Sequence, residues 1–234
     1  MIMDFLKPHV DPVGDDRHVM ARHRMVEEIK ATANEIYGHE SMPISEKVLS
    51  IMEHVPRHRF VPEEESYDAY YNHPLPIGYG QTISQPFIVA LMTELLVVGK
   101  QNRVLEVGTG SGYQAAILAE IAGEVFSMEI VEPLAARAAN LLNELGYVNV
   151  QVKAGDGNYG WPEHAPFDGI IVTAAPGHVP QPLLDQLKPG GRMVIPVGDW
   201  PYAQELILIT KSQDGTLQQK NVLPVSFVPL TGGH

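Results

Sequence analysis

The sequence of 234 residues contains no cysteine, which excludes disulfides, thiolate zinc sites and cysteine nucleophiles. It also has no unbroken run of the roughly 20 apolar residues that a membrane span requires. Near the N-terminus, Asp4, Lys7 and Pro8 interrupt the continuous apolar core that a signal peptide needs. We therefore expect a cytoplasmic protein with no membrane partner.

Positive charge is scarce, because 16 Lys and Arg residues face 28 Asp and Glu residues, which gives a net charge of −12. A broad basic surface, which nucleic-acid binding requires, is therefore not expected. Ten histidines are present, but Pro56 separates His54 from His58, and His164 and His178 have no carboxylate partner at ligand spacing. We expect neither a metal nor a nucleic-acid partner.

The N-terminal part of the chain changes its pattern several times. Residues 1–16 show no periodicity and are predicted to be a flexible tail. Apolar residues then recur at three- and four-residue steps, which predicts helices over 17–37, 45–55 and 86–97. Residues 72–85 contain two prolines, at 74 and 76, and two glycines, at 78 and 80. They are predicted to be a stiff apolar loop without regular structure that lines a site.

From residue 103 onward, short β-rich runs alternate with amphipathic helical patterns. This alternation predicts a mostly parallel, doubly wound α/β sheet with helices on both faces. The last two runs flank Asp214-Gly215, which predicts an antiparallel hairpin at the sheet edge. The predicted strands are 103–107, 124–129, 148–153, 167–173, 192–197, 205–210 and 220–227, and the predicted helices among them are 113–121, 133–145 and 181–187.

A glycine-rich segment follows the first of these strands: residues 105–113 read Leu-Glu-Val-Gly-Thr-Gly-Ser-Gly-Tyr. Glycines there permit a tight turn and a close approach of a ligand to the N-terminus of the next helix. A dinucleotide-binding oxidoreductase is the alternative, but its fingerprint places a third glycine where this chain has Tyr113, and the third glycine here is Gly112. Glu106 adds a negative charge that disfavours a pyrophosphate and favours a cationic ligand.

Acidic residues stand at three consecutive strand ends, namely Glu106, Glu129 and Asp156. Because parallel strands end at the same edge of a sheet, we expect these acids to line one crevice. Glu129 is placed to accept hydrogen bonds from two ribose hydroxyls, and Asp156 from an adenine amino group. Adenosine with a cationic group fits this set, and S-adenosylmethionine is the common molecule of that description. The alternative is that the glycines only form turns and the acids only cap helices.

The absence of certain motifs and residue types disfavours several classes of methyl acceptor. Residues 172–176 read Val-Thr-Ala-Ala-Pro, without the Asp/Asn-Pro-Pro-Tyr that methylation of base amino groups commonly uses. Carbon methylation of pyrimidines needs a cysteine, and catechol-type transfer usually needs a metal held by Asp and Asn. A carboxylate, with a reference pKa near ~3.5, is ionised at pH 7 and needs no general base. A cofactor-sensing module without turnover remains an alternative.

Several motifs spread over residues 25–230 match one family. They are 55–62 (VPRHRFVP), 74–78 (PLPIG), 80–86 (GQTISQP), 105–113, 155–157 (GDG), 196–198 (PVG) and 227–230 (FVPL). Together they resemble the protein-L-isoaspartate O-methyltransferases. The resemblance implies a Rossmann-like class I S-adenosylmethionine-dependent methyltransferase with N-terminal helices. It also implies a repair enzyme that methylates the free α-carboxylate of L-isoaspartyl residues in damaged proteins and peptides.

The resemblance also suggests residue roles. It implies that Ser84 is the active-site residue, although Ser84 is also placed to cap the helix near Pro86. The implied cofactor-binding residues are Thr82, Ile83, Glu106, Gly108, Thr109, Gly110, Ser111, Gly112, Glu129, Asp156, Gly157 and Thr231. The implied substrate-binding residues are Thr82, Ile83, Ser84 and Val228. We expect one domain over 17–234, with N-terminal helices and a substrate loop over 17–98 and a cofactor-binding sheet over 99–234.

Overall fold

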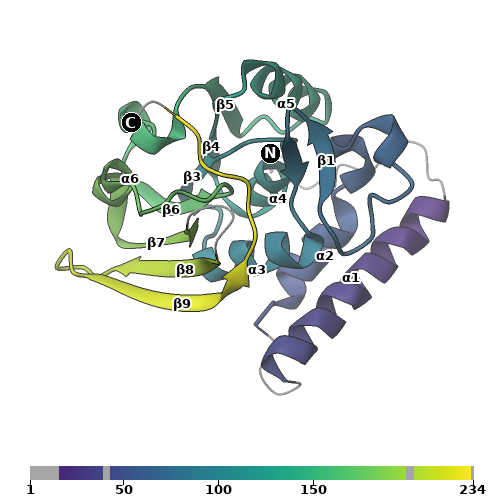
Figure 1. Cartoon of the computed structure of the whole chain (residues 1–234), viewed down its shortest axis with the longest axis horizontal. Coiled ribbons are helices and arrows are strands. Elements are labelled where there is room, and N and C mark those ends of the chain that lie inside the picture. Colours follow the sequence, from purple (N-terminus) through teal and green to yellow (C-terminus); the bar gives the residue numbers. More distant parts are fainter. Residues whose placement is uncertain (1–15, 39–42, 199–202, 233–234) are drawn as a thin grey trace, which may run out of the picture.

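A seven-stranded sheet forms the centre of the computed structural model, which describes residues 16–38, 43–198 and 203–232 (Figure 1). Its strands lie in the order β5-β4-β3-β6-β7-β8-β9. The pairs among β3 to β7 are parallel, and β8 and β9 are added antiparallel at one edge. The strands are β3 (Arg103–Val107), β4 (Glu124–Glu129), β5 (Val150–Ala154), β6 (Phe167–Val172), β7 (Leu187–Val197), β8 (Gln204–Lys211) and β9 (Leu217–Val225). The predicted fold class is confirmed.

The direction of the strand order reverses at β3, because β4 lies on one side of it and β6 on the other. In open parallel sheets of this kind, ligands bind outside the carboxyl ends of the strands at such a reversal. The site is therefore expected above Val107, at the end of β3.

Helices cover both faces of the sheet, as expected for parallel strands (Figure 1). They are α1 (Asp16–Tyr37), α2 (Glu46–His54), α3 (Pro86–Leu96), α4 (Tyr113–Ile121), α5 (Glu132–Glu144) and α6 (Gln181–Gln186), with short 3₁₀ helices at Arg57–Phe60, Glu63–Glu65, Gly157–Tyr159 and Pro162–His164. Val104 belongs to one buried apolar cluster, whereas Leu105 and Val107 belong to another. This alternation along β3 places a packed core on each face of the sheet.

Residues 72–85 differ from the prediction, because they contain a two-stranded antiparallel hairpin formed by β1 (Leu75–Gly78) and β2 (Gln81–Ile83). The chain reverses through three consecutive residues with positive φ, Gly78, Tyr79 and Gly80. Pro76 is tolerated because a two-stranded ribbon has a free edge on which a missing N–H costs no ladder bond. The prolines and glycines that argued against regular structure are therefore accommodated by an edge position and a turn.

Several further sequence predictions need adjustment; β7, for example, begins at Leu187 rather than at 192. Ser84 does not cap α3, because the N-cap is Gln85 and it makes no side-chain capping bond. Strand β9 begins at Leu217 rather than at 220, because the turn at Ser212–Gly215 is tight and both strands pair right up to it. Residues 217–221 are exposed and only Leu217 among them is apolar, so no apolar alternation marked them as a strand.

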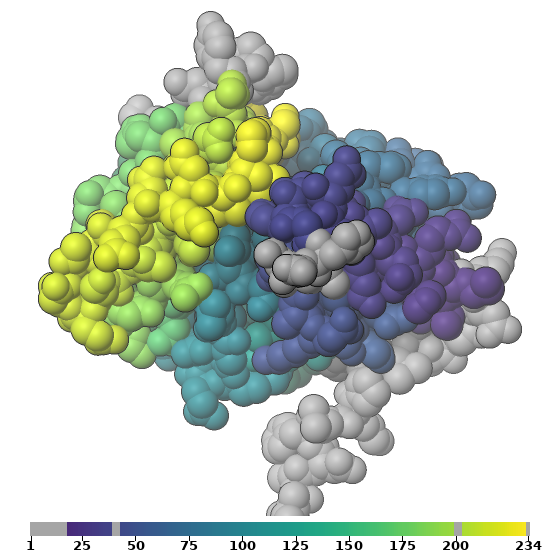
Figure 2. Space-filling model, turned by 90° about the horizontal axis from the view of Figure 1, so that it is seen from below, coloured from purple at the N-terminus to yellow at the C-terminus, as the bar shows by residue number. Residues whose placement is uncertain are grey.

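The N-terminal boundary is also slightly shifted, since α1 begins at Asp16; the rest of the predicted tail lies outside the described residues. In the described part of the chain, no helix combines the length and the apolarity that crossing a membrane requires. On the face of the molecule that Figure 2 shows, the C-terminal hairpin (yellow) lies on one side and the N-terminal helices (purple and blue) lie on the other.

Candidate active site

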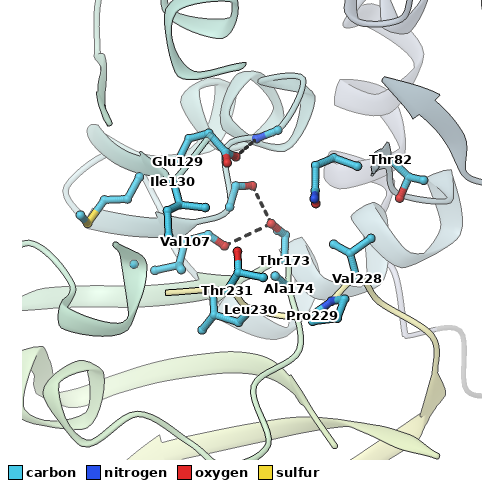
Figure 3. A pocket seen from close by; sticks show the side chains of 15 residues that line it. Thr82, Val107, Glu129, Ile130, Thr173, Ala174, Val228, Pro229, Leu230 and Thr231 are labelled. Carbon is cyan, nitrogen blue, oxygen red and sulfur yellow. Dashed lines mark hydrogen bonds between the residues drawn. The ribbon is translucent and has the colours of Figure 1, made fainter. Parts of the chain in front are cut away.

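A cavity lies at the carboxyl ends of β3, β4 and β6, where the strand order reverses (Figure 3). We call it the first cavity. Thr82 and Glu129 lie on opposite sides of it, with Thr173 between them. Among the predicted site residues, those that line this cavity are Thr82, Gly108, Gly110, Glu129, Gly157, Val228 and Thr231.

The glycine loop is bonded to the ends of its neighbouring strands. The backbone N–H groups of Gly108 and Thr109 both donate to the Met128 carbonyl, at 2.8 and 3.1 Å. The Thr173 hydroxyl donates to the carbonyls of Gly108 (2.6 Å) and Val107 (3.1 Å), as Figure 3 shows. Gly108 has a φ of 98°, and a Cβ there would overlap the Thr173 hydroxyl. Only glycine fits at this position.

Glu129 places a nearly buried carboxylate on the wall of the first cavity. Its Oε2 accepts from the backbone N–H of Gly110 at 2.7 Å, and its Oε1 accepts from that of Val131 at 2.9 Å. Two backbone donors fix the orientation of the side chain. Each carboxylate oxygen can accept more than one hydrogen bond, so both can still accept hydrogen bonds from the hydroxyl groups of a ligand.

Glu106 is not on the wall of this cavity, although it was predicted to contact the cofactor. Its side chain is 0% exposed, and the Ser127 hydroxyl donates to its Oε2. Burial raises the pKa of the Glu106 carboxyl to about 8, so at neutral pH this group is mostly protonated. Because side chains alternate along a strand, the acid before the loop points to one face of the sheet and not out of its end.

Asp156 caps the turn after β5, with its Oδ1 accepting from the backbone N–H of Asn158 at 2.9 Å. Of the three acids predicted to share a crevice, the lining of the first cavity includes Glu129 only. Gly232 passes so close to the Asp156 carboxylate that a Cβ on it would overlap. The end of the described chain therefore lies against this turn.

Four other predicted residues are not among those that line the first cavity. Ile83 and Thr109 are buried, with 3% of each exposed. The Ser111 hydroxyl accepts from the backbone N–H of Tyr113 at 3.2 Å, and Gly112 is the N-cap of α4 with a φ of 89°. Their predicted contacts with a ligand remain predictions.

A second cavity adjoins the first. Ser84, Phe87 and Phe227 line it together with part of α1, and it shares Thr82, Thr173 and Val228 with the first cavity. Among the described residues that line it, none has a charged side chain. The structure therefore brings Ser84 to the side of this common wall that lies away from Glu129.

The C-terminal segment forms part of that common wall because it is bonded to the chain after β6. The Ala175 N–H donates to the Val228 carbonyl, and the Leu230 N–H donates to the Ala175 carbonyl, both at 2.8 Å. Pro229 makes an isolated parallel bridge with Ala175. This pairing explains how residues more than 50 positions apart come to share one cavity.

Sequence reasoning missed several residues of the first cavity, including Thr173, Ala174 and Ile130. Thr173 and Ala174 had been considered only for the carboxamide that they lack. Their place directly after a parallel strand was a usable signal, because the residues after such strands line the sites of α/β proteins. Among the described residues, no group of three His, Asp or Glu side chains is arranged to hold a metal.

The sheet order, the glycine loop after its first strand and the acid at the end of the second define an S-adenosylmethionine-dependent methyltransferase fold. A profile of the protein-L-isoaspartate(D-aspartate) O-methyltransferase family matches residues 33–234. The chain belongs to this family, as its motifs predicted.

Individual relatives agree with this assignment. The chain is 59% identical over 224 residues to protein-L-isoaspartate O-methyltransferase 2 of Syntrophobacter fumaroxidans, with 94% of this chain and 90% of the relative covered. A solved protein-L-isoaspartate O-methyltransferase matches with a TM-score of 0.77 and 29% identity, over 90% of this chain and 66% of that one. A Plasmodium falciparum protein solved with S-adenosyl-L-homocysteine shares the fold, with a TM-score of 0.74 and 24% identity, over 90% of this chain and 98% of that one.

Proposed function

We propose that this chain transfers a methyl group from S-adenosylmethionine to the free α-carboxylate of L-isoaspartyl residues in damaged proteins and peptides. The observation that carries the proposal is the pair of adjoining cavities, which share Thr82, Thr173 and Val228. A methyl donor in the first cavity and a carboxylate in the second would meet at this common wall. Family membership supports the same reaction.

The residues of the first cavity suit an adenosyl ligand. The Glu129 carboxylate, held by the N–H groups of Gly110 and Val131, would accept hydrogen bonds from the ribose hydroxyls. The backbone at Gly108 and Gly110, without side chains in the way, would allow close approach at the N-terminus of α4. When bound, S-adenosylmethionine supplies an electrophilic methyl group on a positively charged sulfur.

The second cavity needs only to present an acceptor that is already nucleophilic. A free α-carboxylate has a pKa near ~3.5, so it is ionised at neutral pH without a general base. Ser84 would donate its hydroxyl hydrogen to one carboxylate oxygen and leave the other aligned with the methyl group. A carbon–oxygen bond forms and a carbon–sulfur bond breaks, so the products are a methyl ester and S-adenosylhomocysteine, and no proton moves.

The ester explains how methylation would repair a protein. An isoaspartyl residue arises when Asn or Asp cyclises to a succinimide that reopens the wrong way. Methylation turns the carboxylate into a better leaving group, so the ring closes again and part of it reopens to normal aspartate.

The test uses two synthetic peptides that differ only in whether one residue is L-isoaspartate or L-aspartate. With radiolabelled S-adenosylmethionine, we expect a base-labile methyl ester on the isoaspartyl peptide and none on its partner. Equal labelling of both peptides would overturn the substrate assignment. Binding of S-adenosylmethionine without transfer to either peptide would favour a sensor of this cofactor over an enzyme.

A further inference from the structure

A buried arginine, Arg57, lies next to Ser84 of the second cavity but is not among the lining residues of either cavity. Arg57 begins the 3₁₀ helix Arg57–Phe60, and its side chain is 0% exposed. Burial lowers the pKa of its guanidinium to about 10, so it still carries its charge at neutral pH. None of the ion pairs between described residues involves Arg57. A buried cation without a carboxylate is costly, so other contacts must compensate its charge.

The first of these contacts hold the backbone of the acceptor side. The Nε of Arg57 donates to the Ala69 carbonyl, and its Nη2 donates to the Ser84 carbonyl, both at 2.8 Å. Guanidinium donors lie in a rigid planar fork, so two bonds from one group fix the distance and the angle between their acceptors. The backbone of Ser84, after the hairpin β1–β2, is thereby linked to the backbone of Ala69, before this hairpin.

The other contact leads to the glycine loop. The guanidinium carbon of Arg57 lies 4.9 Å from the centroid of the Tyr113 ring. Tyr113 is the first residue of α4 and follows the last glycine of the loop directly. A cation above an aromatic face is attracted to it, and this attraction is stronger where water is excluded. One guanidinium therefore contacts both Ser84, which lines the second cavity, and Tyr113, at the end of the glycine loop of the first cavity.

We infer that Arg57 is a positioning residue, which sets the separation between the acceptor carboxylate and the methyl donor by linking Ser84 to Tyr113. This inference rests on the proposed function, because it assigns those two partners to the two cavities. Transfer of a methyl group requires in-line alignment, and a displacement of about 1 Å can cost roughly 100-fold in rate. Lysine would keep the charge, but it lacks the planar fork that makes both hydrogen bonds while stacking on a ring.

The test compares Arg57→Lys with Arg59→Lys. Arg59 stands two residues later and makes a half-exposed ion pair with Glu144 at 2.5 Å, away from both cavities. For Arg57→Lys we expect kcat to fall about 10- to 100-fold, with the Kd for S-adenosylmethionine changed less than about twofold. Arg59→Lys should keep both values. Folded molecules are counted by their binding of S-adenosylhomocysteine, and kcat is expressed per binding molecule.

A second variant, Arg57→Gln, keeps one NH2 group as donor and removes the charge, and it should lower kcat at least as much as Arg57→Lys. Combining Arg57→Lys with Ser84→Ala should lower kcat by less than the product of the two single effects, because both act on the same contact. A merely structural arginine would lower the unfolding temperature and leave kcat per binding molecule unchanged.

Three results would overturn the inference. They are an unchanged kcat in both variants, fully multiplicative effects with Ser84→Ala, or loss of cofactor binding in step with turnover. The last result would mean that Arg57 stabilises the whole fold and does not specifically position Ser84. A failure of the proposed function is distinguishable, because the unmodified protein would then leave the isoaspartyl peptide unlabelled.

Discussion

The two halves of the site are held in place by different kinds of contact. The glycine loop, residues 105–113, is positioned by backbone bonds to neighbouring strands, such as those from Gly108 and Thr109 to Met128, and by two side chains at the ends of those strands, Thr173 and Glu129. The backbone bonds follow from the register of a parallel sheet and need no particular side chain. The acceptor segment, residues 72–85, is positioned by side-chain hydrogen bonds that join it to other parts of the chain.

Three side chains show this dependence. Asn72 donates to the Thr32 hydroxyl and accepts from the backbone N–H of Phe87, both at 2.9 Å. Arg137 of α5 donates to the Ile77 carbonyl at 2.8 Å, and Arg57 donates to the Ser84 carbonyl at the same distance. Changes in the glycine loop should therefore affect stability and cofactor binding, whereas changes in the acceptor segment should affect turnover.

The largest effect is expected from Gly108→Ala. The new Cβ would overlap the Thr173 hydroxyl, and an L-residue is strained at a φ of 98°. Overpacking and left-handed backbone strain together should cost about 2–5 kcal/mol of unfolding free energy. Cofactor affinity should fall at least about 100-fold. Urea unfolding and calorimetric titration with S-adenosylhomocysteine measure both effects.

The matched control is Gly215→Ala in the β8–β9 turn. Gly215 also has a positive φ, of 87°, but a Cβ there has no atom within 4 Å. This variant should lose only the strain energy and should bind the cofactor normally. If the two variants bound the cofactor equally well, the close packing of the glycine loop would have no role in binding.

The next effect is a pH dependence caused by Glu106. Burial raises the pKa of this carboxyl to about 8 in the folded protein, against 4.5 when it is exposed. Between these two values the folded state holds a proton that the unfolded state has lost, so stability should fall as the pH rises from about 4.5 to 8. Glu106→Gln keeps a neutral group of similar shape and should remove this slope.

Urea unfolding at pH 5, 6.5 and 8 measures the slope. The difference between the unmodified protein and Glu106→Gln should grow toward pH 8 by an amount on the order of a few kcal/mol. Glu35→Gln, at an exposed position in α1, should keep the original slope. Parallel curves for Glu106→Gln and the unmodified protein would show that the buried carboxyl does not titrate in this range.

Glu129→Ala should act on cofactor binding alone. The loss of hydrogen bonds from a charged acceptor to ribose hydroxyls should weaken binding by about 1.5–3 kcal/mol. At saturating S-adenosylmethionine, kcat should stay within about threefold of the original. Titration calorimetry gives the affinity, and methyl transfer to the isoaspartyl peptide gives kcat. Unchanged affinity would remove Glu129 from the ribose site.

The difference between local patterns and long-range side-chain contacts explains what could be predicted from the sequence. The strands β3 and β4, the helix α4 and the glycine loop were predicted with their observed bounds, because local periodicity and a glycine pattern encode them. The hairpin β1–β2 was missed, because contacts from Arg137 and Arg57 hold it, and these residues lie 60 and 27 positions away from their partners. Glu106 was assigned to the crevice because spacing along a strand does not say which face a side chain takes.

The smallest effect, and the one confined most closely to the acceptor segment, is expected from Ser84→Ala. Loss of one orienting hydrogen bond should lower kcat about tenfold, or about 1.4 kcal/mol. Affinity for S-adenosylmethionine should remain within about twofold, because Ser84 lines only the second of the two cavities. Ser50→Ala, on an exposed face of α2, serves as the control and should change neither value. A loss of cofactor affinity as large as the loss of kcat would place Ser84 in the cofactor half and break the division between the two halves. An unchanged kcat would remove the Ser84 hydroxyl from the alignment of the carboxylate.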